Sequence, residues 1–232
     1  ADGRYDYMET GSLISIRENV KDILIPSEED HVDMYPLDFE EFLQVFNVGE
    51  PVLHTLRNAF TSKTPVDEMI HRKLMEMFHL YLIIGGMPEA VDTYVKTNDL
   101  AKVAQVHEKI IRLYKKDFSK YEVRYKLKLR EIYDAMPGQL DQKNKSFQLN
   151  SIEKGISYDR VANDFLWLKD AGAVIPVYNV SEPKLPLVIN ENRNLFKLFF
   201  SDVGLLTSCY SNQVKISILN KDRSINNGAL FE

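Results

Sequence analysis

The stretch LIIGGMPEAV, at residues 82–91, decides how the first half of the chain folds. An apolar helical pattern ends there at Gly85-Gly86, and a second helical pattern begins at Pro88. Glycine is common just after the last turn of a helix, and proline is common in the first turn. A tight turn between two helices is therefore predicted here. Two interpretations stay open. The break is an ordinary turn, or it holds the backbone and the rigid Pro88 ring against a flat group such as a purine base.

Helices are predicted on both sides of this break. Apolar residues recur at helical spacing over residues 51–61, 67–84, 88–96 and 98–122. Further upstream, PLDFEEFLQVF (36–46) places Glu41 three residues after Asp38. This spacing is the capping-box pattern, and it predicts a short helix that buries its phenylalanines.

The pattern changes after residue 125. KLKLREIYDAM (126–136) predicts a helix closed by Pro137-Gly138, and SIEKGIS (151–157) a short helical or turn segment. YDRVANDFLWLKDAG (158–172) predicts an amphipathic helix closed by Gly172. AVIPVYNV (173–180), PLVIN (186–190) and LFKLFF (195–200) predict strands. Helical segments followed by a hairpin are typical of a winged helix.

Composition indicates one large globular domain or two small ones. The chain has 232 residues, of which 44% are hydrophobic and 27% charged. Cys209 is the single cysteine, which excludes an internal disulfide and favours a reducing, cytoplasmic location. No apolar run is long enough to span a membrane, so no membrane partner is expected. The first residues do not resemble a signal peptide, and both ends read as if cut within an element, so a fragment is expected.

Charge is distributed unevenly along the chain. Residues 1–50 carry 13 acidic and 3 basic residues, whereas residues 109–130 carry 9 basic and 2 acidic residues. Such asymmetry indicates either a solvated helix face or a basic surface for DNA or an acidic protein partner. The candidate residues of that surface are Lys115, Lys116, Lys120, Arg124, Lys126 and Lys128. Helix 158–171 is slightly acidic, so we expect it to pack in the core rather than to read a DNA groove.

Several common catalytic motifs are missing from the sequence. It has no GxxxxGK[ST] phosphate loop, GxGxxG, HExxH or CxxC. His71 and His79 share one predicted helix, but no carboxylate pair completes a metal site, and none is expected.

Five motifs in order resemble a known family. They are YMETGSLIS, YPLDFEEFL, GGMPEAV, WLKDAGAV and FKLFFSDVGLL. In this order they resemble the prokaryotic AAA+ superfamily ATPases, near the archaeal-ATPase and STAND branch of P-loop proteins, which carry a C-terminal nuclease-like domain of unknown function. The resemblance covers essentially the whole chain.

The resemblance implies a nucleotide site built partly from this chain. Gly86, Met87 and Pro88 match the lid motif whose proline packs on the adenine ring. Thr10 and Ser12 would be the sensor hydroxyls near the γ-phosphate, and Arg17 a charge-stabilising arginine. In this family the Walker A and Walker B residues lie upstream of Ala1. ATP or ADP with Mg²⁺ is therefore expected to bind the parent protein and not this chain alone, which is expected to be inactive.

The resemblance also implies four parts. Residues 1–48 would be the C-terminal edge of the P-loop α/β core, 49–122 a helical lid, 123–190 a winged helix, and 191–232 the start of the α/β nuclease-like domain. Glu232 would match a helix glutamate preceding that domain's catalytic acids. The expected class is mainly α with some β. The expected function is coupling of nucleotide state to lid and winged-helix movement, and the alternative is a non-catalytic winged-helix module that binds DNA or a protein. The oligomeric state is left open.

Overall fold

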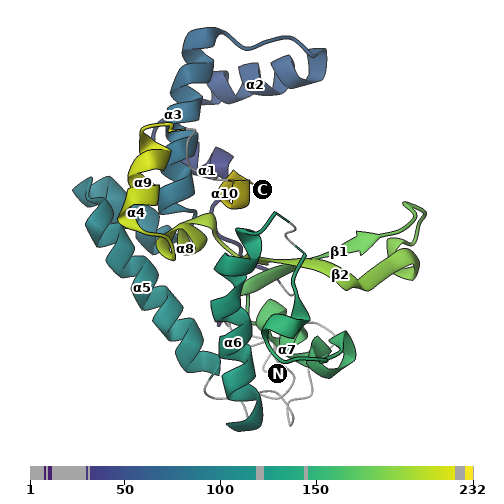
Figure 1. Ribbon diagram of the computed structural model, residues 1–232. Coiled ribbons are helices and arrows are strands. Elements are labelled where there is room, and N and C mark those ends of the chain that lie inside the picture. The colour runs from purple at the N-terminus through teal and green to yellow at the C-terminus, as the bar shows by residue number, and fades with distance from the viewer. Residues whose placement is uncertain are drawn as a thin grey trace, which may run out of the picture.

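The computed structural model describes residues 8, 10–11, 30, 32–118, 123–143, 146–222 and 228–231, with the backbone alone over 123–127. Within these ranges the protein is mainly helical and contains a two-stranded antiparallel sheet (Figure 1). The expected class, mainly α with some β, is confirmed.

The first half of the described chain is entirely helical. Its helices are α1 (Phe39–Val45), α2 (Glu50–Ser62), α3 (Glu68–Ile84), α4 (Pro88–Thr97) and α5 (Leu100–Asp117). The predicted capping box begins α1: the Glu41 amide donates to Asp38 Oδ1 at 2.8 Å, and the Asp38 amide donates to Glu41 Oε2 at 2.9 Å. α2 and the first part of α3 form an arm at one end of the molecule, as Figure 1 shows, while the rest of α3 lies in the body.

The second half surrounds the hairpin. Its elements are α6 (Val123–Leu140), the 3₁₀ helix η3 (Leu149–Ser151), α7 (Tyr158–Asp170), β1 (Val174–Val180), the 3₁₀ helix η4 (Leu187–Asn190), β2 (Glu191–Phe200), α8 (Val203–Ser208), α9 (Asn212–Leu219) and α10 (Gly228–Phe231). α7 ends where predicted, because Gly172 has the positive φ of 67° that a helix end requires.

Two predictions about this half are wrong in detail. α6 is not closed by Pro137-Gly138 but continues to Leu140. Met136 and Leu140 are almost fully buried, and this core packing outweighs the backbone hydrogen bond that a proline lacks. The segment PLVIN is not a strand, because Leu187–Asn190 forms η4 at the tip of the hairpin.

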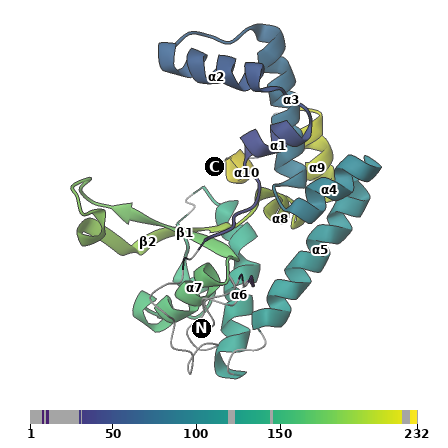
Figure 2. The same cartoon turned by 180° about the vertical axis from the view of Figure 1, so that it is seen from behind.

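The hairpin has one buried face. β1 and β2 pair from Val174 opposite Phe200 to Tyr178 opposite Phe196, after which the register shifts and Asn179 lies opposite Asn192. Alternate residues of this pairing, including Phe196 and Phe200, point into the core. The distal part of the hairpin projects from the body in both views (Figures 1 and 2).

Two hydrophobic cores meet at the end of α3. One core joins α6, α7, the hairpin and α8 to the α3 residues Leu82 and Ile83. The other core joins α1, α2, α4 and α5 to Ile84 of the same helix. Met87, just after α3, packs against both cores. The α3–α4 turn, residues 85–88, therefore lies at the boundary between the two cores.

Candidate functional site at the α3–α4 turn

Gly85 ends α3 in a conformation that glycine alone adopts readily. Its φ is 71° and its ψ is −166°, and its amide donates to the Tyr81 carbonyl at 2.7 Å. A Cβ atom at this position would lie 2.1 Å from Asp202 Oδ1. The predicted helix-ending role of Gly85 is confirmed, and the close approach of Asp202 is an additional reason for glycine.

Gly86 is held by the segment that precedes α1. The Leu37 amide donates to the Gly86 carbonyl at 2.8 Å, and the Tyr81 hydroxyl donates to the Leu37 carbonyl at 2.9 Å. A Cβ atom on Gly86 would lie 1.9 Å from the Leu37 carbonyl oxygen. The two backbones are thus in direct contact, which requires a residue without a side chain at position 86.

Asp202 holds the other side of the turn. It is 4% exposed, and its Oδ2 accepts the Gly86 amide at 2.6 Å, while its Oδ1 accepts the Leu205 amide at 3.1 Å. Asp202 thereby caps α8 and binds the α3–α4 turn with the same carboxylate. Burial raises the pKa of Asp202 to about 6, against the opposing effect of hydrogen bonds from the Gly86, Leu205 and Gly204 amides.

Two further buried side chains bind the last carbonyl groups of α3. Thr207 Oγ1, from α8, donates to the Leu82 carbonyl at 2.6 Å. His107 Nε2, from α5, donates to the Ile84 carbonyl at 2.9 Å, so the proton must be on Nε2. Burial lowers the pKa of His107, and the nearby Lys215 charge acts in the same direction, against the hydrogen bond to Ile84. Asp202, Thr207 and His107 together form what we call the polar junction.

Pro88 contrasts with the buried glycines before it. It occupies the first position of α4, as predicted, and its ring is exposed, whereas Met87 is half-buried. Beside it, Glu89 forms an ion pair with Lys109 of α5 at 2.7 Å. The sequence-predicted residues Gly86, Met87 and Pro88 thus form a turn with a fixed backbone and one accessible proline ring.

A protein-family model described as Domain of unknown function (DUF8612) matches residues 75–215. The chain belongs to this family. The matched region contains the α3–α4 turn and all three residues of the polar junction. No curated protein and no solved structure shows a significant match to the chain.

Sequence reasoning missed the polar junction of this DUF8612 protein. Asp202 lies 116 residues from Gly86, and His107 and Thr207 looked like ordinary helix residues. The available signal was local: Asp202 in SDVGLL precedes an apolar helical run, which is the pattern of a helix N-cap. That pattern predicts the cap of α8 but not its second partner.

The other implied nucleotide residues are not brought to the turn by any contact in the described part of the chain. Thr10 is described and exposed. Ser12 and Arg17 lie outside the described residues, as does Glu232.

The basic surface is partly neutralised by neighbouring acids. Lys115 forms an ion pair with Asp134 at 2.6 Å, and Lys128 with Glu153 at 3.6 Å. Lys116 also has an interaction partner. Lys120 and the side chains of Arg124 and Lys126 lie outside the described residues. Lys115 thus links α5 to α6, and Lys128 links α6 to the segment that follows η3.

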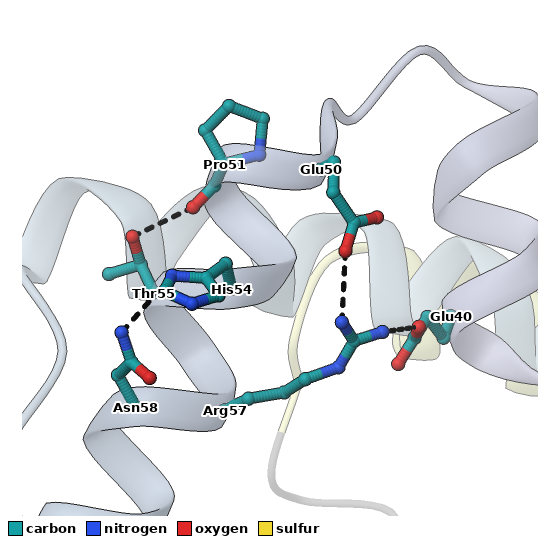
Figure 3. Close-up of polar contacts among 7 residues, drawn as sticks. All are labelled: Glu40, Glu50, Pro51, His54, Thr55, Arg57 and Asn58. Carbon is teal, nitrogen blue, oxygen red and sulfur yellow. Dashed lines mark hydrogen bonds and ion pairs between the residues drawn. The ribbon is translucent and has the colours of Figure 1, made fainter.

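An exposed charge cluster at the base of the arm joins α1 to α2 (Figure 3). The Arg57 guanidinium donates to Glu50 Oε1 at 2.9 Å and also binds Glu40. These hydrogen bonds raise the pKa of Arg57. Because the cluster is open to solvent, it orients α2 without contributing much stability. It has no unpaired charge that points to a ligand.

Two findings concern function classes rather than single residues. No group of three metal-ligating side chains occurs among the described residues. No helix in the described part of the chain is long and apolar enough to cross a membrane.

Asp164 of α7 is a second buried aspartate, but it lacks the partners that Asp202 has. It is 2% exposed, and its Oδ2 has no hydrogen-bond partner within the described ranges. Burial raises the pKa of Asp164 to about 6, although the nearby Lys128 charge acts in the opposite direction. A buried carboxylate without compensation destabilises the charged form of the folded protein.

Asp164→Asn is therefore expected to stabilise the protein in a pH-dependent way. The pKa of Asp164 is about 6 in the folded state, whereas the ordinary pKa of an aspartate is 3.8. The folded state therefore binds this proton more tightly, and wild-type stability falls as the pH rises from about 4 to about 6. The substitution should raise the free energy of unfolding by about 1–2 kcal/mol at pH 7.5 and change little at pH 4. Urea unfolding followed by circular dichroism at both pH values measures this. Asp170→Asn, an exposed position in the same helix, is the control, and an equal gain at both pH values would contradict the expectation.

Proposed function

We propose that this chain is the C-terminal portion of an ATP-binding, AAA+/STAND-like ATPase. In this proposal the α3–α4 turn contacts the nucleotide base through Pro88, and residues 49–122 act as the lid. ATP hydrolysis, with Mg²⁺, belongs to the parent protein, whose upstream part supplies the phosphate-binding residues. The sensor residues Thr10, Ser12 and Arg17 are part of the same proposal, as is a cytoplasmic location.

The observation that carries the proposal is the contrast within the turn. Gly86 is fixed on both sides, by Leu37 and by Asp202, while the Pro88 ring two residues later is exposed. A rigid apolar ring on a fixed backbone suits contact with a flat base, because little conformational entropy is lost when the contact forms.

The arrangement after the lid supports a winged-helix role. α6, η3 and α7 precede the β1–β2 hairpin, which is the element order of that module. β2 leads directly into α8, whose cap residue Asp202 binds the turn. A nucleotide-dependent movement of the lid would therefore reach the hairpin through one short segment. β2, which begins at Glu191, is the second strand of the hairpin and pairs with β1. The proposed nuclease-like part, residues 191–232, therefore begins with a strand of this hairpin.

Calorimetric titration of Mg-ADP tests the proposal directly. Two proteins are compared, this chain and the parent protein extended upstream. We expect saturable binding by the longer protein and none by this chain. Absence of binding by the longer protein would overturn the ATPase proposal.

Pro88→Ala in the longer protein should weaken ADP binding. Loss of one apolar contact with the base costs about 1 kcal/mol, which corresponds to roughly a fivefold higher Kd. Pro51→Ala is the matched control, because Pro51 is also an exposed proline in the first turn of a helix, α2. An equal Kd for both variants would contradict a base contact at Pro88.

The alternative, a non-catalytic winged-helix module that binds DNA or a protein, has weaker support. Lys115 and Lys128 already form ion pairs, so fewer charges remain for phosphate groups. Binding of duplex DNA at low salt that is lost when Lys115, Lys116 and Lys120 are changed to Glu would favour this alternative.

A further inference from the structure

In the polar junction, three buried polar side chains meet at one helix end. Asp202, His107 and Thr207 are each no more than 4% exposed, and each binds a backbone group between Leu82 and Gly86. Helix ends leave carbonyl groups without intrahelical partners, and solvent or nearby backbone usually satisfies them. Here side chains from α5 and α8 satisfy them instead, so the end of α3 is bound to two other elements.

Asp202 differs from its two neighbours in what it binds. His107 and Thr207 bind carbonyl groups of α3 itself, before the turn. The Asp202 carboxylate binds the Gly86 amide, inside the turn, and the Leu205 amide, in the first turn of α8. If the turn shifts relative to α8, either the Asp202 carboxylate moves with the turn or its hydrogen bond to the Gly86 amide breaks. Breaking this bond is costly, because it leaves a buried amide without an acceptor.

We propose that Asp202 is a latch that couples the α3–α4 turn to α8. While the carboxylate holds the Gly86 amide, the turn and α8 move together, and the turn moves alone only after the carboxylate releases that amide. The latch itself concerns this chain and does not depend on the ligand. Its use as a relay from the nucleotide to β2 and α8 rests on the proposed function.

The surroundings of Asp202 make the latch releasable. The groups that feel its charge are the hydroxyls of Tyr81 on α3, Tyr114 on α5 and Tyr133 on α6. All three are neutral near pH 7, since the ordinary pKa of tyrosine is about 10 and burial raises it further here. His107, from α5, is also kept neutral, with Lys215 of α9 nearby. The carboxylate is thus stabilised by backbone amides rather than by a cation. Burial still raises its pKa to about 6, so above that pH the charged carboxylate is better hydrated after release than in the closed latch.

The first test measures hydrogen exchange of single backbone amides in this chain by NMR. Asp202→Asn keeps the shape and the α8 cap oxygen but offers an NH₂ group where Oδ2 accepted the Gly86 amide. We expect Gly86 exchange to rise about tenfold or more, the scale of a lost hydrogen bond to a charged group. Asp164→Asn removes an equally buried aspartate elsewhere and should leave Gly86 unchanged. Equal Gly86 protection in Asp202→Asn and wild type would overturn the latch.

A second measurement covers the case in which Asp202→Asn does not fold. In the wild type, Gly86 protection, corrected for the intrinsic rate, should rise severalfold between pH 7.5 and pH 5, because the carboxyl, with a pKa of about 6 in the closed latch and an ordinary value of 3.8, binds its proton more tightly while the latch is closed. The Ala90 amide is the internal reference, because it donates to the Met87 carbonyl, which does not titrate. Parallel behaviour of the two amides would overturn the proposal.

The relay is tested in the longer protein with ADP as the probe. We expect ADP to change exchange at Leu205 in the wild type, and Asp202→Asn to abolish that change while ADP still binds. If ADP does not bind, the proposed function is wrong, and the latch is then tested by the amide exchange of Gly86 alone. If ADP binds and the Leu205 response survives in Asp202→Asn, the relay is wrong and the nucleotide proposal is unaffected.

Discussion

Gly86→Ala is expected to be among the most destabilising single substitutions in this chain. The added Cβ would lie 1.9 Å from the Leu37 carbonyl oxygen and 2.7 Å from the Leu37 amide nitrogen. These are backbone atoms, so no side-chain rotation relieves the overlap. The Leu37–Gly86 hydrogen bond of 2.8 Å would have to break, and the turn would have to shift against Asp202. We expect a loss of about 3 kcal/mol or more, a large share of the stability of a typical domain.

Urea unfolding followed by circular dichroism measures this loss, with Gly138→Ala as the matched control. Gly138 lies within α6, and a Cβ atom there would meet nothing within 4 Å. Alanine is favoured over glycine inside a helix by up to about 1 kcal/mol, so the control should be neutral or slightly stabilising. If Gly86→Ala unfolds at the same urea concentration as Gly138→Ala, the close contact with Leu37 is not a constraint on the fold.

The elements that sequence predicts well are those fixed by local chemistry. The Asp38–Glu41 capping box, the glycine end of α3 and the proline start of α4 each depend on residues within four positions of one another. Their signals are therefore visible in the sequence alone. The turn at Gly85-Gly86 was predicted for this reason, including its use of glycine and proline.

The parts that sequence misses depend on tertiary contacts. The local pattern at Pro137-Gly138 indicates a helix end, yet burial of Leu140 in the core keeps α6 helical for another turn. Likewise, the apolar run Leu187–Asn190 has the composition of a strand but lies at the exposed hairpin tip, where it has no partner strand among the described residues. Partners, rather than propensity, decide both cases.

The candidate site shows the same division more sharply. Gly86 and Pro88 are visible as motif residues, whereas the reason for two successive glycines comes from two other segments. One is the backbone of Leu37, and the other is the carboxylate of Asp202. Neither segment is near the turn in sequence. Two separate motifs of the chain, GGMP and SDVG, thus form one structural unit, and the family model spans both.

The second large effect is expected in the aromatic cluster that joins α7 to the hairpin. Phe165 is 1% exposed and contacts three rings: Phe196 of β2 at a centroid distance of 5.0 Å, Tyr158 at 5.8 Å and Phe147 at 5.9 Å. Edge-to-face and stacked ring pairs add to the free energy of burial. Phe165→Ala removes all three contacts and leaves a cavity, so we expect a loss of about 3–5 kcal/mol.

Leu166→Ala is the matched control for this prediction, because Leu166 is the next residue of the same helix and is 54% exposed. It changes helix propensity little and buries little surface, so its effect should stay within about 1 kcal/mol. Fluorescence of Trp167, the single tryptophan, reports on the same helix during urea unfolding. Because Phe165 and Phe196 link α7 to β2, loss of their contact should also weaken the attachment of the hairpin, seen as faster amide exchange in β1 and β2. Equal midpoints for the two variants would mean that the cluster does not hold the hairpin to α7.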